Sequence, residues 1–345
     1  MSRTALVTGA SGYVGAQLVP ALLDADWQVR VLARSPDRLP QAWRDRVTVI
    51  TGDLADDAAC HEALRGVDVA WYLVHSMDGK GEYAERDRDL ARGFGAAALA
   101  EGVQRLVYLG GLHPRGTALS EHLASRVEVG EILLSSGVPT AVLQAGVVLG
   151  EGSASYQMLR HLTERLPVAV GPRWLTNRIQ PIAVDDVIFY LVRAADLPAE
   201  VNRSFDLGMD EVLTYVAMMK RYAQVTGLRP RHMGIVPVLT PGLASHWVGL
   251  VTPVPAGVAK PLVGSLINDA VVHERDARTM LGVPEGGMLG FDDAVRAAAA
   301  SYDPQRWGRR AARVGAGIVG ASAVAAGAAV AAGLVGRRRD DGGQR

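Results

Sequence analysis

The strongest chemical motif in the sequence is a glycine-rich turn at the end of its first predicted strand. Residues 8–15 read TGASGYVG, which places glycines at positions 9, 12 and 15. Glycines in such a turn let the backbone approach a ligand closely, and the N-terminus of the following helix attracts phosphate. The turn therefore predicts a dinucleotide-binding site, with a tight packing turn as the alternative. The residues predicted to contact the dinucleotide here are Gly9, Ser11, Gly12, Tyr13, Val14 and Gly15.

Residues at the ends of the next two predicted strands indicate which dinucleotide would bind. Arg34 ends the second strand, where an acidic residue would bind the ribose 2′-hydroxyl of NAD. An arginine can instead pair with the 2′-phosphate of NADP, so the sequence favours NADP(H), with NAD(H) as the alternative. Asp53 and Leu54 follow the third strand, where the carboxylate could accept hydrogen bonds from the adenine amino group. A solvated Arg34 and an Asp53 that caps the next helix are the competing interpretations.

These motifs lie at the ends of short apolar segments that alternate with helix-length amphipathic segments. This alternation predicts a parallel sheet covered by helices on both faces, an α/β doubly wound fold of Rossmann type. The helical segments are long enough for the right-handed crossovers that join parallel strands. The predicted strands are Thr4–Thr8, Gln28–Ala33, Val47–Thr51, Val69–Val74, Arg105–Leu109 and Thr140–Ala145, and the predicted helices are Gly12–Asp24, Asp57–Leu64, Glu82–Glu101 and Ser120–Ser135.

The regular alternation weakens after Gly150. Further elements are predicted at Ser155–Glu164 (helix), Arg178–Asp186 (a strand leading into a helix started by aspartate), Asn202–Leu207 (strand) and Glu211–Thr226 (helix). Residues 235–272 are rich in proline, glycine and aliphatic side chains, which fits a lid, a lipophilic substrate wall or buried packing. We therefore predict an NAD(P)-binding domain over 1–150, a small α+β substrate lobe over 151–306 that is partly interleaved with the sheet, and a distinct C-terminal segment over 307–345.

The composition narrows the range of partners. Lys+Arg and Asp+Glu both total 36, so the net charge is zero and no nucleic-acid partner is expected. Cys60 is the single cysteine, which excludes an intramolecular disulfide and leaves no cysteine cluster for zinc, so no metal site is predicted. No signal peptide precedes the first strand, so we expect the nucleotide-binding domain in the cytoplasm.

These motifs together resemble the short-chain dehydrogenase/reductase superfamily, in its extended and atypical branches, and most closely its NmrA-like and isoflavone-reductase-like NAD(P)H-binding members. The resemblance covers about residues 4–210 and includes the glycine turn, Arg34, Asp53, the end of the fourth strand and the turn PIAVDD at 181–186. It implies that the glycine turn binds pyrophosphate and that Asp53 reads adenine. It also implies that the end of the fourth strand passes the nicotinamide ribose, a role that falls on Leu73, Val74 and His75.

The sequence departs from the superfamily at its catalytic pair. Active members carry Tyr-x-x-x-Lys on the helix after the fifth strand, but none of the three lysines here has a tyrosine four residues before it. His122 and Arg126 stand at the corresponding positions, and a glycine, Gly110 or Gly111, replaces the usual serine after the fifth strand. His122 could act as the acid and Arg126 could hold the ribose, with His75 and His113 as secondary candidates.

The C-terminal segment contains a long uncharged stretch at 314–336. As a helix it would extend about 34 Å, enough to cross a hydrocarbon core of about 30 Å. Arginines flank it on both sides, so charge does not fix its orientation. We predict a hydrophobic C-terminal helix that anchors the protein to the cytoplasmic membrane, with a flexible Ala/Gly-rich tail as the alternative.

The resemblance and the residues together predict an NADPH-dependent reductase that acts on a small, lipophilic carbonyl or enone substrate. A non-catalytic NADP(H)-binding sensor or scaffold is the alternative, because the expected tyrosine and lysine are missing. A sugar-nucleotide epimerase or dehydratase is disfavoured, because it would need the same pair.

Overall fold

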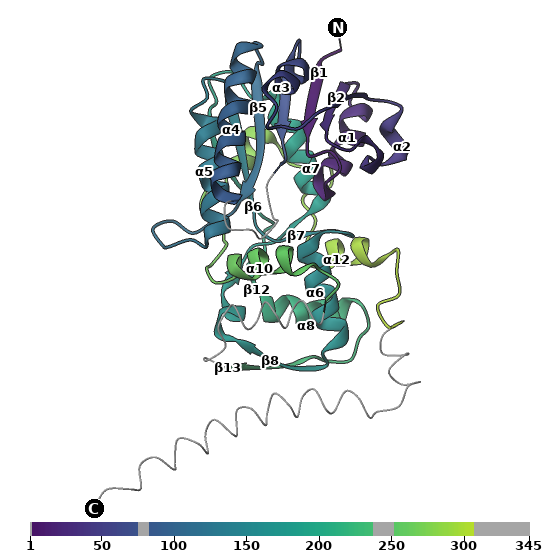
Figure 1. Ribbon diagram of the computed structural model, residues 1–345. Helices are drawn as coiled ribbons and strands as arrows, with labels where there is room; N and C mark the ends of the chain where they lie inside the picture. The colour runs from purple at the N-terminus through teal and green to yellow at the C-terminus, as the bar shows by residue number, and fades with distance from the viewer. Residues whose placement is uncertain (1, 75–82, 237–251, 307–345) are drawn as a thin grey trace, which may run out of the picture.

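A seven-stranded parallel sheet forms the centre of the protein, as the computed structural model shows for residues 2–74, 83–236 and 252–306, the part of the chain that it describes (Figure 1). The strand order is β11-β6-β5-β4-β1-β2-β3. The chain adds strands on one side of β1 up to β3 and then on its other side from β4 onward, as in doubly wound dinucleotide-binding folds. The strands are β1 (Thr4–Thr8), β2 (Gln28–Ala33), β3 (Thr48–Thr51), β4 (Val69–Tyr72), β5 (Arg105–Gly111), β6 (Thr140–Ala145) and β11 (Arg203–Leu207). The predicted α/β fold is confirmed.

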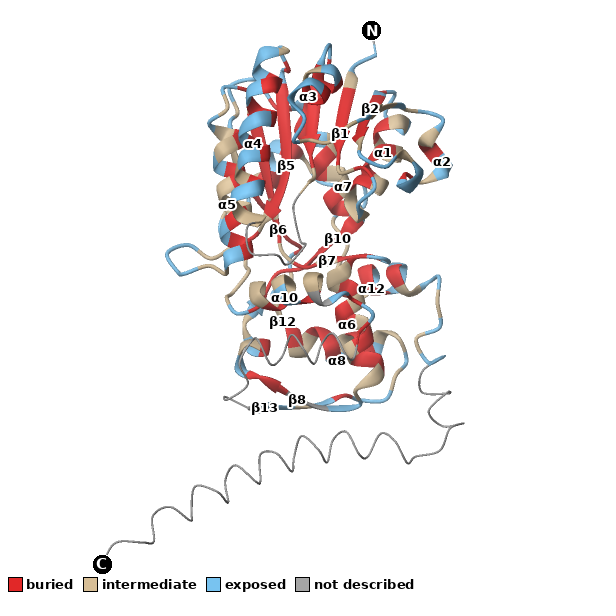
Figure 2. Ribbon diagram, in the orientation of Figure 1, coloured by how far each residue is buried: buried red, intermediate tan, exposed pale blue. Residues whose placement is uncertain are grey.

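Helices cover both faces of this sheet, because successive strand residues point to opposite sides. Val7 belongs to the core under α1 (Tyr13–Asp24), α2 (Gln41–Arg44) and α7 (Val184–Arg193). The neighbouring Leu6 belongs to the core under α3 (Asp57–Leu64), α4 (Tyr83–Ala100) and α5 (Glu121–Leu134). Figure 2 shows the strands buried between these two helical layers.

A smaller lobe lies beyond the carboxyl ends of the strands (Figure 1). Its core gathers around Tyr156, Tyr222 and Phe291, which are almost fully buried. Three two-stranded pairs border it: β7 (Val148–Leu149) with β10 (Ile182–Ala183), β9 (Arg178–Ile179) with β12 (Leu213–Thr214), and β8 (Val168–Pro172) with β13 (His232–Val236). Its helices are α6 (Ala154–Arg165), α8 (Tyr215–Val225), α10 (Ala256–Ser265) and α12 (Phe291–Ala299), while α11 (Asp276–Leu281) packs on β11.

Two predicted elements of this region differ from the structure. The helix expected from Glu211 begins at Tyr215, because Leu213 and Thr214 pair with β9 and the Thr214 hydroxyl caps the helix by accepting from the Ala217 amide at 3.1 Å. The helix expected to start at an aspartate has Ala183 at its N-cap position.

The predicted membrane segment at 314–336 lies outside the described residues. Within the described ranges, no helix combines the length and the apolarity that a membrane crossing requires.

Candidate functional site

The glycine turn between β1 and α1 is shaped by close backbone contacts. Gly9 has φ +72°, and a Cβ added to it would lie 2.7 Å from the carbonyl oxygen of Leu73. A Cβ on Gly15 would lie 2.4 Å from the carbonyl oxygen of Gly9. The Gly12 amide donates to the same oxygen at 2.9 Å. Side chains are thus excluded at these glycines, which leaves bare backbone at the carboxyl edge of the sheet. We call this backbone, within residues 8–15, the glycine cradle.

The ends of β1 and β4 are joined next to this turn. The Thr8 hydroxyl donates to the Trp71 carbonyl at 3.1 Å and accepts from the Leu73 amide at 3.3 Å. Leu73 and Val74 follow β4 and are half-buried against the cradle. The structure therefore brings both residues to the glycine turn, while His75 lies outside the described residues.

The N-terminus of α1 is suited to receive an anion. Its N-cap, Gly12, has no side chain to satisfy the first amide groups, whereas Asp56, Ser120 and Ser153 cap α3, α5 and α6 with side-chain oxygens. Unsatisfied amides at a helix N-terminus attract phosphate. Ser11 and Gly12 are exposed at this end of the helix, so a diphosphate has access to it.

Tyr13 connects the glycine turn to the lobe. Within the described part of the chain its buried hydroxyl has no hydrogen-bond partner, and a Cβ on Gly150 would lie only 2.2 Å from it. Burial is the main reason that the pKa of Tyr13 is raised, so the hydroxyl keeps its proton. A buried orphan hydroxyl at the edge of the cradle is consistent with a bound ligand that supplies the missing partner.

Arg34 and Asp53 stand together at the other end of the predicted cofactor site. Nη1 of Arg34 lies 3.7 Å from Oδ2 of Asp53, and the arginine side chain is 67% exposed. Oδ1 of Asp53 accepts from the Ala55 amide at 3.0 Å and forms a turn, while the helix cap is Asp56. The interpretation of Asp53 as a helix cap is therefore wrong. Both side chains remain accessible to an adenosine moiety.

The first two turns of α5 carry His122 and Arg126 to the end of β5. Nη2 of Arg126 donates to the Leu109 carbonyl at 2.7 Å, and its buried Nε has no partner in residues 2–74, 83–236 and 252–306. A Cβ on Gly111 would lie 3.7 Å from this Nε and 2.6 Å from Cδ1 of Leu123. Glycine at the end of β5 thus provides the space that Arg126 and Leu123 occupy.

His122 is 7% exposed, and its environment opposes protonation. Burial, followed by the nearby charge of Arg126, lowers the pKa of His122 to about 4. The imidazole is therefore neutral near pH 7 and can donate a hydrogen bond through one ring nitrogen. His113 lies in the loop after β5, where its Nδ1 is 3.1 Å from the Gly111 carbonyl oxygen.

The lobe contains a second group of polar side chains, but these pack in its core. The hydroxyl of Tyr302 lies 2.6 Å from that of Tyr156 and 2.9 Å from that of Tyr222, which donates to Glu164 at 2.7 Å. Arg160 donates to the same carboxylate at 3.1 Å. These contacts join α6, α8 and the end of the lobe, so Tyr156 and Arg160 serve the packing of the lobe.

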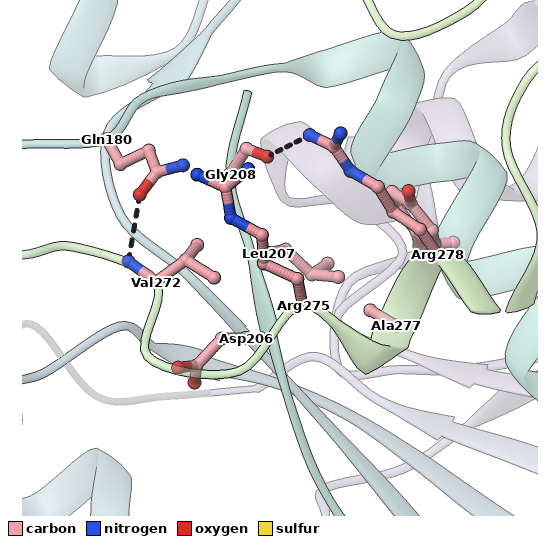
Figure 3. Close-up of a pocket in the computed structure, with 9 residues that line it drawn as sticks. Gln180, Asp206, Leu207, Gly208, Val272, Arg275, Ala277 and Arg278 are labelled. Atoms are coloured by element: carbon pink, nitrogen blue, oxygen red, sulfur yellow. Dashed lines mark hydrogen bonds between the residues drawn. The ribbon is translucent and has the colours of Figure 1, made fainter. Parts of the chain in front are cut away.

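A small pocket that the sequence did not predict lies at the carboxyl end of β11 (Figure 3). Buried Gln180 accepts from the Val272 amide at 3.0 Å through Oε1, and Arg278 donates to the Gly208 carbonyl at 3.3 Å. The pocket measures about 10 Å³, the space of one water, so it is not a site for a cofactor or an organic substrate. Gln180 lies within residues 178–186, where the sequence predicted a strand leading into a helix. That segment was the only feature of the sequence that marked this junction.

Metal ligands do not gather anywhere in the part of the chain that the structure describes. The glycine cradle, the uncapped helix and the orphan Nε of Arg126 all lie along the carboxyl edge of the sheet, so the residues present fit a dinucleotide. This arrangement can bind a diphosphate at α1, an adenosine at Arg34 and Asp53, and a reacting group near α5.

The chain is similar to several known proteins. Residues 9–145 match a family of NAD(P)H-binding domains. A ceramide reductase from Caulobacter vibrioides is 30% identical over 74% of this chain and 81% of its own length. A (4-alkanoyl-5-oxo-2,5-dihydrofuran-3-yl)methyl phosphate reductase from Streptomyces griseus is 29% identical over 70% of this chain and 81% of its own length. Among solved structures, the triphenylmethane reductase of Citrobacter sp. complexed with NADP(H) superposes with a TM-score of 0.64 over 86% of this chain and 99% of that chain, at 15% identity.

Proposed function

The chain belongs to the NAD(P)H-binding short-chain dehydrogenase/reductase superfamily, in its atypical, NmrA-like branch, and we propose that it is an NADPH-dependent reductase of a lipophilic carbonyl or enone compound. The observation that carries the proposal is the bare glycine cradle at the uncapped N-terminus of α1. A cofactor with a diphosphate group makes use of both features.

The choice of NADPH over NADH rests on Arg34. Arg34 directly follows β2, and its guanidinium is exposed. An acidic residue at this position would bind the free ribose hydroxyls of NADH. Asp53 holds Arg34 only at 3.7 Å, so a 2′-phosphate can replace this contact with a stronger, charge-assisted one. NADH remains the alternative cofactor.

The reaction class rests on the named relatives. Two of them, matched over most of their length, are reductases, and the first is named for a lipid. When bound, NADPH supplies a hydride to an electrophilic carbon, and a proton must reach the carbonyl oxygen to give the alcohol and NADP⁺. Neutral His122 would donate a hydrogen bond to that oxygen, and Arg126 would hold the cofactor ribose through its unpartnered Nε.

A non-catalytic NADP(H)-binding sensor is the second candidate. The absence of Tyr-x-x-x-Lys and the low pKa of His122 favour it, because a neutral imidazole is a weaker acid than the superfamily's usual pair provides. Oxidation of NADPH, followed at 340 nm against long-chain ketones, enones and quinones, separates the two candidates. Turnover supports the reductase, and tight NADPH binding without turnover on any of these substrates supports the sensor.

A membrane anchor at 314–336 would place a reductase of this kind beside a lipophilic substrate. The proposal rests on the sequence, in which this stretch carries no charge. The full chain and a version that ends at Trp307 should partition differently when cells are fractionated without detergent. Recovery of both proteins in the soluble fraction would contradict the anchor.

A further inference from the structure

Glu274 lies between two arginines that come from distant parts of the chain. Its Oε2 is 2.6 Å from Nη2 of Arg203 on β11, and its Oε1 pairs with Arg115 in the connection between β5 and α5. Asp276 adds a second carboxylate, 2.7 Å from the same nitrogen of Arg203. Hydrogen bonds and charge from Arg115, with Arg203 contributing, lower the pKa of Glu274, so the carboxylate is ionised at neutral pH.

The segment that carries Glu274 is fixed to the lobe on one side and to the sheet on the other. The Ala270 amide donates to the Arg178 carbonyl and the Gln180 amide donates to the Ala270 carbonyl, both at 2.8 Å. Asp206 of β11 accepts from the His273 amide, also at 2.8 Å. Glu274 therefore stands where the lobe meets the edge of the sheet.

The connection between β5 and α5, residues 112–120, also touches this junction. Its two ends are fixed, because the Leu112 amide donates to the Ala145 carbonyl at 3.0 Å and the Ser120 side chain caps α5. Asn268 donates to the Ala118 carbonyl at 3.1 Å, and Arg115 binds Glu274. Between these contacts Gly116 has φ +72°, and apart from its chain neighbours no described residue comes within 4 Å of where its Cβ would be. The tip of the connection projects from the molecule (Figure 1). The connection leads directly into the turns of α5 that carry His122 and Arg126.

We propose that Glu274 is a positioning residue: through Arg115 it holds the 112–120 connection against the lobe, beside the carboxyl ends of β5 and β6, and thereby affects how the substrate of the proposed reductase enters there. The substrate part of this proposal rests on the proposed reductase function. Ligands of doubly wound folds bind at these strand ends, and a Cβ added to Gly146, after β6, would lie 3.8 Å from Cδ2 of Leu112 and 3.9 Å from Cβ of Ala270. Release of Glu274 would free the connection without disturbing the cofactor contacts at β1, β2 and β4.

Limited proteolysis tests the contact without any need for a substrate. Trypsin cleaves after Arg115, whose side chain is 65% exposed but paired with Glu274. Glu274→Gln removes the charge and keeps the shape, so cleavage at this bond should accelerate by roughly 1.5- to fivefold, the range expected for loss of partly exposed ion pairs. Asp293→Asn, which breaks the exposed Arg296–Asp293 pair on α12, is the matched control and should leave the rate unchanged. Equal cleavage of Glu274→Gln and the unmodified chain would overturn the proposal.

A second pair of variants covers the case in which Glu274→Gln folds poorly. Arg115→Gln should increase hydrogen exchange of amides 112–120, and Arg115→Lys, which keeps the charge, should restore most of the protection. Exchange that is the same in both variants and in the unmodified chain would also overturn the proposal.

Kinetics then connect the contact to the substrate. Glu274→Gln should raise the KM for the substrate roughly 1.5- to fivefold, with kcat and the Kd of NADPH nearly unchanged. High salt should raise the KM of the unmodified chain and not that of the variant, because salt screens exposed ion pairs. If Glu274→Gln is cleaved faster but the protein reduces no substrate, the proposed function is refuted and the positioning contact stands. If the enzyme is active and Glu274→Gln leaves the KM unchanged, the role of Glu274 in substrate entry is refuted.

Discussion

The guanidinium of Arg126 packs against Gly111, so that a Cβ added to the glycine would lie 3.7 Å from the arginine Nε. The superfamily pattern has a serine after the fifth strand and a lysine on the following helix, and here both positions have changed. Leu123 occupies the space beside the glycine, because a Cβ at Gly111 would lie 2.6 Å from its Cδ1, while Arg126 would stay at an ordinary contact distance. Restoring the serine should therefore disturb the packing of Leu123.

Gly111→Ser should destabilise the protein by roughly 1–3 kcal/mol, the usual cost of overpacking. The added Cβ would lie 2.6 Å from Cδ1 of Leu123 and would force α5 or its side chains to move. Denaturant unfolding of the variant measures this cost. Gly93→Ser, on an exposed face of α4 with no atom within 4 Å, is the control and should change stability by less than about 0.5 kcal/mol. A Gly111→Ser protein as stable as the control would show that this space is not filled.

Arg34→Ala should weaken NADPH binding by roughly tenfold or more and leave NADH binding nearly unchanged. A charge-assisted hydrogen bond to phosphate contributes about 1.5–3 kcal/mol, and NADH has no phosphate at this position. Calorimetric titration with both cofactors measures the difference, with Arg65→Ala, an exposed arginine after α3, as the control. Equal affinity of the unmodified chain for NADPH and NADH would show that Arg34 does not select between the two cofactors.

Gly9→Ala should abolish cofactor binding, whereas Gly66→Ala should not. Both glycines have left-handed φ values, +72° and +68°, so an alanine imposes similar backbone strain at either position. Only Gly9 faces a close backbone neighbour, since nothing lies within 4 Å of an added Cβ at Gly66. NADPH titration of the two variants, with stability measured in parallel, separates strain from loss of the cradle. Intact NADPH binding by Gly9→Ala would show that the cofactor does not use this turn.

The sequence predicted the sheet well and the lobe poorly, for a physical reason. The strands Thr4–Thr8 and Gln28–Ala33 are buried apolar runs followed by helices, and their signals are local. The lobe pairs two-residue strands such as Leu213–Thr214 with partners far away in the chain, and no local pattern marks them. The same distinction applies to the site. The glycine turn is a local motif, but the burial of His122 and the fit of Arg126 beside Gly111 depend on packing between elements.

His122→Ala should reduce kcat by about 10²- to 10⁴-fold if the imidazole assists proton transfer, with NADPH affinity nearly intact. Arg126→Ala should instead weaken NADPH binding, because its Nε has no partner among the residues that the structure describes. Because the pKa of His122 is about 4, its charge should cause no change in kcat between pH 6 and pH 8. Steady-state kinetics of both variants test this division of roles. Unchanged turnover in His122→Ala would show that His122 does not assist proton transfer. His113 and His75 would then be the candidates for this role.

Stability should fall as the pH is lowered from about 7 to 5, and two buried histidines should be the main cause. Burial, reinforced by nearby arginines, lowers the pKa of both His122 and His161 from 6.5 to about 4. Below pH 6.5 the unfolded chain therefore takes up protons that the folded chain does not, and each histidine costs roughly 1–2 kcal/mol by pH 5. Asp186 acts in the opposite direction, because burial raises its pKa from 3.8 to about 6 and the folded state gains its proton first. Urea unfolding at several pH values should show a flatter dependence in His161→Gln and a steeper one in Asp186→Asn. If His161→Gln retains the full loss of stability between pH 7 and pH 5, then His161 is not held neutral by its surroundings.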